Sequence, residues 1–285
     1  MAEKRKSVIV TFKPKDQRPD STVDKVDIVR GVITQVAQPT FFSATTLLSG
    51  VTRPPLPEHL IGYDINQYEA PIVAASLSDA EIDALRKNGN VALVEDDAPC
   101  YALGGPLQNL VIEDQPSVQS ETVPAGVAQV KAPPAWGSSR GKGIRVAVVD
   151  TGIDFKHPDL QANYQGGVSF VPGAPTPMDD NSHGTHCAGT IAAAINGVGV
   201  VGVAPEAYLY AVKVLDKNGS GQFSWIIAGI DWCIQHGVHI VSMSLGGTGI
   251  GVSHEGVSNC RMLDQRLKRW TIESWMKGRQ TLQAG

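Results

Sequence analysis

The first hundred residues alternate between short apolar runs and polar connections. These runs predict strands at residues 7–12, 70–77 and 91–94. A weaker apolar spacing over residues 20–31 indicates a helix, whereas residues 38–57 have no clear period and are expected to form a loop. Ser78-Asp-Ala-Glu81 has the form of a capping box, which predicts a second helix between the last two strands. Strand, helix and strand in this order predict a small α+β domain.

A glycine- and proline-containing stretch at residues 104–123 separates this region from the rest and reads as a linker. Beyond it, residues 144–149 form a continuous run rich in β-branched side chains, which is typical of a buried parallel strand. Asp150 follows this run directly. Since ligands bind at the carboxyl ends of parallel strands, Asp150 is placed to orient a neighbouring group. Taken alone, Asp150 is also compatible with a turn cap. The stretch 179–194 predicts a loop that enters a helix of small residues near His183.

Composition narrows the class of protein. The chain has 285 residues, of which 42% are hydrophobic and 18% charged, as in a globular protein, and its formal net charge of −4 gives no indication of nucleic-acid binding. No apolar run reaches the ~18 residues of a transmembrane helix. The apolar run at residues 8–10 is too short for a signal-peptide core, so we expect no leader and assign no localisation. The four cysteines form no C-x-x-C pair, which favours inert thiols over a disulfide framework or zinc site.

Three short motifs suggest alternative chemistries, but each lacks a feature that its chemistry requires. Asp150-Thr-Gly is also the signature of aspartic proteases, but only one copy is present, so a homodimer would be required. His183 and His186 have H-x-x-H spacing without the glutamate of the H-E-x-x-H zinc motif. The glycines of Gly141-Lys-Gly143 precede their strand instead of following it, which disfavours a dinucleotide site.

Two motifs together suggest a family. V-A-V-V-D-T-G-I-D at 146–154 and H-G-T-H-C-A-G-T at 183–190 closely resemble motifs of the subtilases, the subtilisin-like serine peptidases. The resemblance continues through residues 197–205, 208–215, 218–225 and 238–247. It implies an α/β fold whose mostly parallel sheet has helices on both faces. Residues 60–100 resemble the end of a subtilase propeptide, which implies a ferredoxin-like α+β pro-domain that acts as an intramolecular inhibitor.

The resemblance also implies site residues. His183 would take a proton from a serine hydroxyl, and Asp150 would orient the imidazole. Two extended segments would hold a protein or peptide substrate as an added strand. They comprise Gly219, Ser220, Gly221, Ser244, Leu245, Gly246 and Gly247. A structural Ca²⁺ site, with no catalytic metal, would use side-chain oxygens of Glu121, Asp159 and Asn196 and the backbone carbonyls of Ala194, Val198 and Val200.

The motif resemblance ends at Gly247. The serines Ser253, Ser258 and Ser274 lie outside any G-T-S-M-A context, so the nucleophile is not recognisable. We therefore expect residues 1–103 to be a propeptide, 104–120 a linker, 121–247 the N-terminal part of a truncated catalytic domain, and 248–285 a divergent tail. Apolar residues of that tail also permit a membrane-binding or partner-binding helix. Two functions follow: a serine endopeptidase precursor, or a catalytically inactive fragment that binds peptides or an intact protease.

Overall fold

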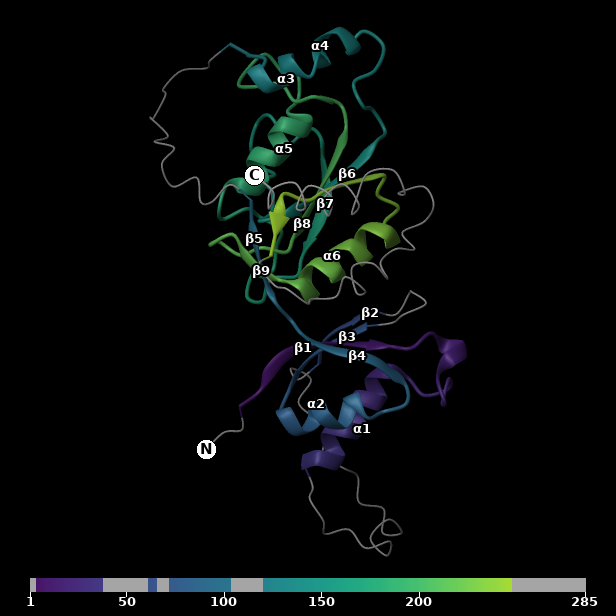
Figure 1. Cartoon of the computed structure of the whole chain (residues 1–285). Helices are drawn as coiled ribbons and strands as arrows, with labels where there is room; N and C mark the ends of the chain where they lie inside the picture. The colour runs from purple at the N-terminus through teal and green to yellow at the C-terminus, as the bar shows by residue number, and fades with distance from the viewer. Residues whose placement is uncertain (1–3, 38–60, 66–71, 104–119, 248–285) are drawn as a thin grey trace, which may run out of the picture. The chain divides into compact units, whose positions relative to one another are not determined.

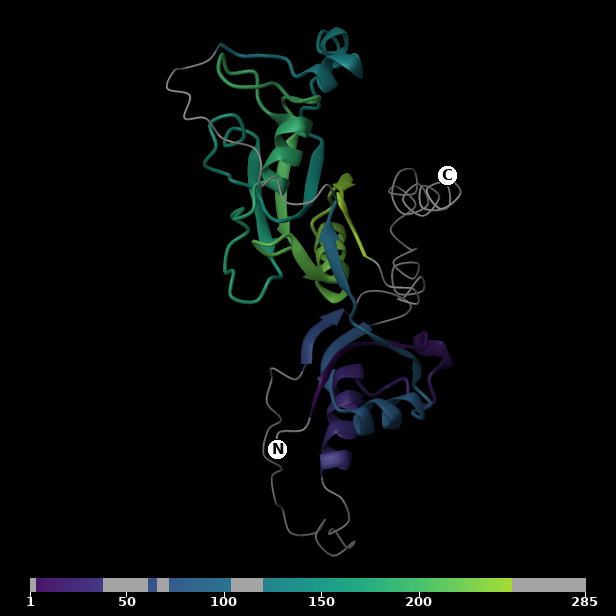
Figure 2. The ribbon, with the colours of Figure 1, turned by 60° about the vertical axis from the view of Figure 1, so that its left-hand side comes forward.

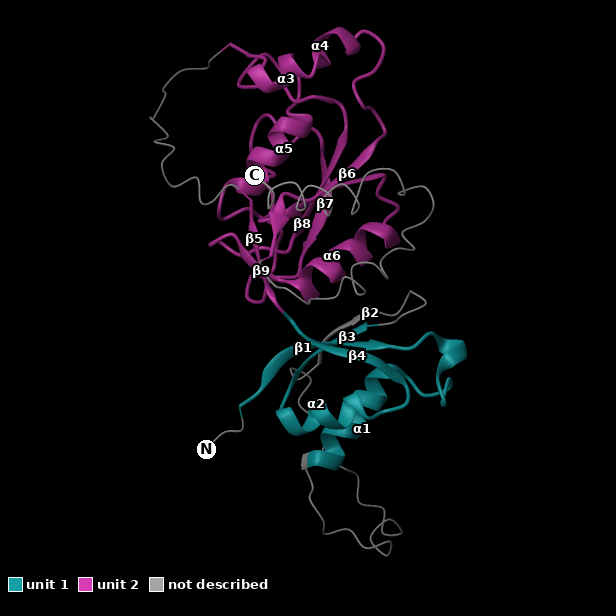
Figure 3. Cartoon of the chain, in the orientation of Figure 1, with its two compact units in different colours: residues 1–97, 250–262 teal, residues 98–249, 263–285 magenta. Residues whose placement is uncertain are grey.

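The structure is a computed structural model that describes residues 4–37, 61–65, 72–103 and 120–247 (Figure 1). The predicted loop at 38–57 and the tail at 248–285 lie outside these residues. The described chain forms two compact units, residues 4–97 and 98–247, which are considered separately (Figure 3). The predicted domain boundary was at residue 103, whereas the units divide between Asp97 and Ala98.

Unit 1 is an antiparallel four-stranded sheet with two helices. The strands occur in the order β2-β3-β1-β4, and β1 lies in the interior of the sheet. Their bounds are β1 Lys6–Phe12, β2 Ile61–Ile65, β3 Ile72–Leu77 and β4 Val91–Asp96; the helices are α1 Lys25–Ala37 and α2 Asp79–Arg86, and a 3-10 turn spans Lys15–Gln17. The helix predicted over residues 20–31 begins later, because the side chain of Asp24 accepts from the Val26 amide at 2.8 Å.

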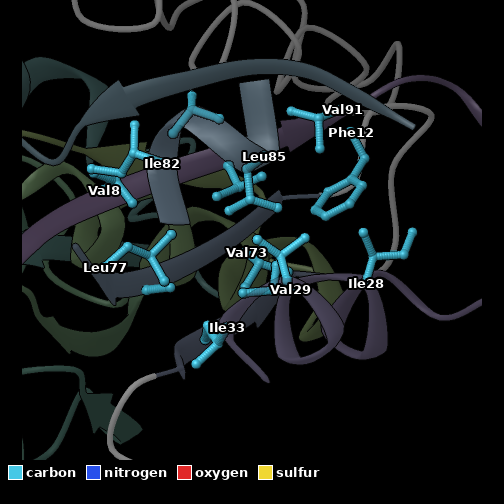
Figure 4. Packing of buried hydrophobic residues seen from close by; sticks show 14 residues of the cluster. Val8, Phe12, Ile28, Val29, Ile33, Val73, Leu77, Ile82, Leu85 and Val91 are labelled. Carbon is cyan, nitrogen blue, oxygen red and sulfur yellow. The ribbon is translucent and has the colours of Figure 1, made fainter. Parts of the chain in front are cut away.

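The core of unit 1 lies between one face of the sheet and both helices (Figure 4). Alternate residues of β1, Val8, Val10 and Phe12, point into it. The capping box is present: the Ser78 amide donates to Glu81 Oε2 at 2.7 Å, and the Glu81 amide donates to Ser78 Oγ at 3.4 Å. The buried Glu81 carboxylate also accepts two hydrogen bonds from Arg5, at 2.9 and 3.1 Å. The predicted helix start is therefore confirmed, and it is tied to Arg5, the residue that precedes β1.

Unit 2 is built on a parallel sheet in the order β10-β6-β8-β7. Its strands are β6 Arg145–Asp150, β7 Tyr164–Ser169, β8 Tyr208–Lys213 and β10 Ile240–Ser242. Helix α5, His183–Ala192, packs against the face that carries Val146 and Val148. Helix α6, Phe223–Gln235, packs against the opposite face, where Gly229 lies against Val149 and Val212 (Figure 2). The predicted α/β arrangement with helices on both faces is therefore confirmed in this unit.

Smaller elements complete unit 2. A three-stranded antiparallel sheet has the order β11-β5-β9, and two short helices precede β6. The bounds are β5 Pro99–Ala102, β9 Ser220–Gln222, β11 Leu245–Gly246, α3 Ala125–Gln129 and α4 Ala132–Ala135. Strand β7 has few apolar residues, and at Gly167 an added Cβ would lie 2.0 Å from the Ala211 carbonyl oxygen, so this strand depends on close backbone approach. Among the described helices, none has both the length and the apolar character needed to cross a bilayer.

Candidate active site

Asp150 and His183 meet although 33 residues separate them. Asp150 is the last residue of β6 and is fully buried, and His183 is the first residue of α5. The His183 Nδ1 atom lies 2.8 Å from Asp150 Oδ1 and 3.0 Å from Oδ2. The Thr151 amide donates to Asp150 Oδ1 at 2.7 Å and holds the carboxylate in place. This is the geometry of a carboxylate that orients an imidazole base.

The second ring nitrogen of His183 also faces an acceptor. Its Nε2 lies 2.9 Å from the carbonyl oxygen of Leu103. Since neither a carboxylate nor a carbonyl donates, both ring nitrogens must carry protons for both bonds to form, so this arrangement suits the imidazolium. Burial alone would lower the pKa of His183, but the hydrogen bond and charge of Asp150 and the Leu103 carbonyl raise it above its usual value. Burial raises the pKa of Asp150, and the bonds from His183 and Thr151 oppose that rise.

Asp179 organises the loop that places His183. Its carboxylate accepts from the Thr151 hydroxyl at 2.9 Å, from the Thr185 amide at 2.9 Å and from the Thr185 hydroxyl at 2.5 Å. It also accepts from the amides of Asn181 and Ser182, at 2.9 and 3.1 Å. Although burial opposes ionisation, these bonds hold the pKa of Asp179 below its usual value. Thr151 and Thr185 flank the two site residues, so one carboxylate couples the turn after β6 to the start of α5.

A buried lysine makes a second connection between the same segments. Lys213, at the end of β8, has no exposed surface, and its Nζ donates to the Thr151 carbonyl at 2.5 Å, to Asp180 at 2.6 Å and to the Leu215 carbonyl at 3.0 Å. No role was predicted for Asp179 or Lys213 from the sequence. A signal was present, since a lysine that ends an otherwise apolar strand needs buried acceptors.

Both segments predicted to hold a substrate flank a strand of the chain itself. β5 lies between β9 and β11 and is antiparallel to both, with Cys100 opposite Gly221 and Tyr101 opposite Gly246. The Ala102 amide donates to the Gly219 carbonyl at 2.8 Å, and the Leu103 amide donates to the Ser244 carbonyl at 2.8 Å. This pairing places the Leu103 carbonyl oxygen beside His183 Nε2. The structure thus brings together Gly219, Ser220, Gly221, Ser244, Leu245, Gly246 and, beside the Pro99 carbonyl, Gly247.

The residues predicted to bind calcium meet at a loop that follows α5. Asp159 Oδ2 accepts from the Val200 amide at 2.9 Å, and Asp159 Oδ1 lies 3.2 Å from Asn196 Nδ2. Glu121 Oε1 accepts from the Asn196 amide at 2.6 Å and from the Gly197 amide at 2.9 Å. The Ala194 amide donates to the Asp159 carbonyl at 2.8 Å, and Val198 and Val200 form bridges with residues 120 and 122. The two carboxylates, one amide and the loop backbone are the oxygen-rich donors that Ca²⁺ prefers.

Comparison with known proteins agrees with this geometry. Residues 141–277 match the model of the subtilase family, a region that includes Asp150 and His183 and continues beyond Gly247. This region therefore matches the subtilase family. The family match confirms two predictions made from the motifs alone: the resemblance to the subtilases and the α/β fold class.

Individual relatives give the same assignment. Subtilisin E of Bacillus subtilis (strain 168) is 47% identical over 176 residues, which is 61% of this chain and 42% of the relative. Subtilisin of Bacillus pumilus is 55% identical over 130 residues, 45% of this chain and 46% of the relative. M-protease of Shouchella clausii (strain KSM-K16) is 41% identical over 197 residues, 68% of this chain and 47% of the relative. The chain thus spans less than half the length of these curated relatives.

Proposed function

We propose that this chain is the precursor of a subtilisin-like serine endopeptidase and that His183 and Asp150 are the base and the orienting acid of its triad. The observation that carries this proposal is the contact between His183 Nε2 and the carbonyl of a peptide strand bound between β9 and β11. A peptidase must place a peptide carbonyl beside its base, and here the chain supplies one.

In the proposed reaction, His183 removes the proton of a serine hydroxyl as that oxygen attacks the peptide carbonyl, and then donates the proton to the leaving amine. Asp150 fixes the tautomer and stabilises the imidazolium that forms. Ser253, Ser258 and Ser274 lie outside the described residues, and we assign the nucleophile to none of them. Backbone pairing with β9 and β11 supplies substrate affinity that is independent of the side chains.

Segment Pro99–Leu103 occupies the place of a substrate, so we propose that residues 1–103 act as an intramolecular inhibitor and that the bond after Leu103 is the one hydrolysed on maturation. The Leu103 amide is paired with Ser244, and the Leu103 carbonyl faces the base, as expected for the residue that precedes a scissile bond. While the strand remains in place, it excludes other peptides from both edges.

Two experiments on the full chain test this assignment. A fluorophosphonate probe labels an activated serine, and we expect labelling that His183→Gln abolishes. N-terminal sequencing of matured protein should begin at Gly104. Labelling that His183→Gln leaves intact would show that His183 is not the base, and a first residue far from Gly104 would refute the assignment of Leu103.

A second function, peptide or protease binding without catalysis, is supported by the strand that already fills the site. It predicts no fluorophosphonate labelling, together with binding of a peptide of sequence 98–103 in competition with the attached strand. An aspartic-type mechanism predicts something different: pepstatin-sensitive activity that is lost in Asp150→Asn and retained in His183→Gln.

For the loop at residues 194–200 we propose a structural Ca²⁺ site. Glu121 and Asp159 would supply carboxylate oxygens and Asn196 its amide oxygen, after a half-turn of the amide group that now directs Nδ2 at Asp159. Bound Ca²⁺ would tie the segment before α3 to the loop after α5, which stabilises the scaffold of His183 and leaves the chemistry to the triad.

A further inference from the structure

The loop that precedes α5 contains a carboxylate that has no part in the proposed triad. Asp179 is partly buried and accepts five hydrogen bonds. Its Oδ1 accepts from the Thr151 hydroxyl and from the amides of Asn181 and Ser182. Its Oδ2 accepts from the amide and the hydroxyl of Thr185. Backbone amides therefore point at both oxygens, and the donors come from the turn after β6 and from the segment that begins α5.

We propose that Asp179 is a positioning residue for His183: it holds the imidazole against Asp150 and adds a second negative charge that stabilises the imidazolium. The ring nitrogens of His183 lie against Asp150 and Leu103, so Asp179 acts through the backbone and through hydroxyl groups. The importance of Asp179 for catalysis rests on the proposed function, whereas its effect on the placement of the imidazole does not.

Two threonine hydroxyls carry the connection. Thr151 Oγ1 donates to Asp179 and accepts from the Gly184 amide at 2.9 Å, which ties the turn after β6 to α5. Thr185 Oγ1 donates to Asp179 and accepts from the Asp154 amide at 2.8 Å, which makes the reverse tie from α5 to that turn. A hydroxyl has one proton, and an ionised carboxylate only accepts. Asp179 therefore directs both hydroxyl protons toward itself and leaves the oxygen lone pairs for the two amides.

An asparagine cannot reproduce these bonds. Because backbone amides donate to both oxygens of Asp179, the NH2 group of an asparagine would face a backbone N–H in either orientation, and two donors cannot pair. Asp179→Asn thus removes the charge and part of the acceptor set while the side-chain volume is nearly unchanged. Thr185→Val is complementary, since it keeps the charge of Asp179 and removes one hydroxyl link.

The charge of Asp179 acts on the imidazole as well. Burial opposes the ionisation of Asp179, but its hydrogen bonds lower its pKa below the usual value, so the carboxylate is charged at neutral pH. Burial lowers the pKa of His183, whereas the bond and charge of Asp150 and then the Leu103 carbonyl raise it, and the charge of Asp179 adds to that rise. Titratable groups face the imidazole from three segments: Asp150 on β6, Cys187 on α5 and Asp179 on the preceding loop.

NMR spectroscopy of the full chain with ¹⁵N-labelled histidine tests the placement without any measurement of peptidase activity. The ring signals of His183 are assigned by their absence in His183→Gln. Two readouts are followed. The pH titration of the ring reports the pKa of His183, and the low-field signal of the Nδ1 proton reports the hydrogen bond to Asp150.

The test variants are Asp179→Asn and Thr185→Val, and the matched control is Asp154→Asn. The Asp154 carboxylate lies next to the same turn and accepts from the exposed Lys156 amide at 3.0 Å. It is therefore a neighbouring carboxylate that bonds within its own turn, and its replacement should leave the parent signals in place.

In Asp179→Asn we expect the pKa of His183 to fall and the low-field signal to broaden or vanish. Thr185→Val should weaken the same signal with a smaller fall in that pKa, because the charge of Asp179 remains, and this variant decides the matter should Asp179→Asn not fold. Parent-like signals in both test variants, or lower stability with an unchanged His183 titration, would mean a structural role only and would overturn the proposal.

Fluorophosphonate labelling adds a catalytic readout. Labelling should slow roughly 100-fold in Asp179→Asn, since a displacement of about 1 Å can cost that much. Because labelling requires neutral His183, its pH midpoint should also move to lower pH as the pKa of His183 falls. A midpoint that stays at the parent value would contradict the stabilisation of the imidazolium. A parent that is never labelled would reject the proposed function and leave the NMR result to decide the role of Asp179.

Discussion

Gly184 allows α5 to begin against the turn that carries Asp150, and its substitution tests the construction of the site. A Cβ at this position would lie 2.1 Å from the Gly152 carbonyl oxygen and 3.1 Å from Thr151 Oγ1. The nearest atom belongs to the backbone, so no side chain can rotate away to make room. Gly184→Ala should therefore push the first turn of α5 away from β6 and separate His183 from Asp150.

The same helix contains a matched control. Gly189 has no atom within 4 Å of an added Cβ. Both substitutions gain the same ~0.5–1 kcal/mol from the higher helix propensity of alanine. Only Gly184→Ala suffers overpacking, which costs about 1–3 kcal/mol, so the difference between the two free energies of unfolding isolates that cost. Gly189→Ala should be more stable than the parent, and Gly184→Ala less stable.

Urea denaturation monitored by tryptophan fluorescence measures both variants. The described tryptophans, Trp136, Trp225 and Trp232, all lie in unit 2, so their fluorescence reports on that unit. NMR titration of the His183 ring provides a second readout, because separation from Asp150 should lower the raised pKa of His183 toward its ordinary value. Equal unfolding free energies for the two variants, together with an unchanged His183 titration, would refute the close-packing argument.

Three further predictions concern other contacts. Ser78→Ala should destabilise unit 1 by about 1 kcal/mol in circular-dichroism melts, since the helix loses its cap, and Ser78→Asp should restore most of this loss. The pKa of His183 is raised on folding, so its contribution to the free energy of unfolding should be complete below its unfolded-state pKa of about 6.5. That contribution should disappear as pH rises through the folded-state pKa of His183. Urea titrations that show the same pH dependence in Asp150→Asn would contradict this prediction. Glu206, which pairs with Arg140 and is not among the proposed calcium ligands, provides a control. Ca²⁺ should raise the melting temperature of the parent and of Glu206→Ala but not of Glu121→Ala, and an equal rise in all three would argue against the loop site.

Local signals in the sequence correctly predicted several elements. The capping box at Ser78 and the strand that ends at Asp150 depend on neighbours in the chain, and a pattern of nearby residues is enough to identify them. The resemblance of the segments around Asp150 and His183 to the subtilases was equally local, and the family match confirmed it. The short helix α4, with Pro133 and Pro134, and the glycine-rich β7 have little apolar periodicity and were not predicted.

The sequence by itself therefore determined several strands and helices of the scaffold and identified Asp150 and His183, because apolar periodicity and motif order act over short stretches of chain. Only the tertiary structure decided what these two residues contact. The placement of Leu103 against Nε2 requires the pairing of β5 with strands more than a hundred residues later, and the bonds of Asp179 and Lys213 to the turn at Thr151 cross between separate elements. Hydrogen bonds between distant segments leave no period in a sequence, since their partners are chosen by how the sheet and helices pack.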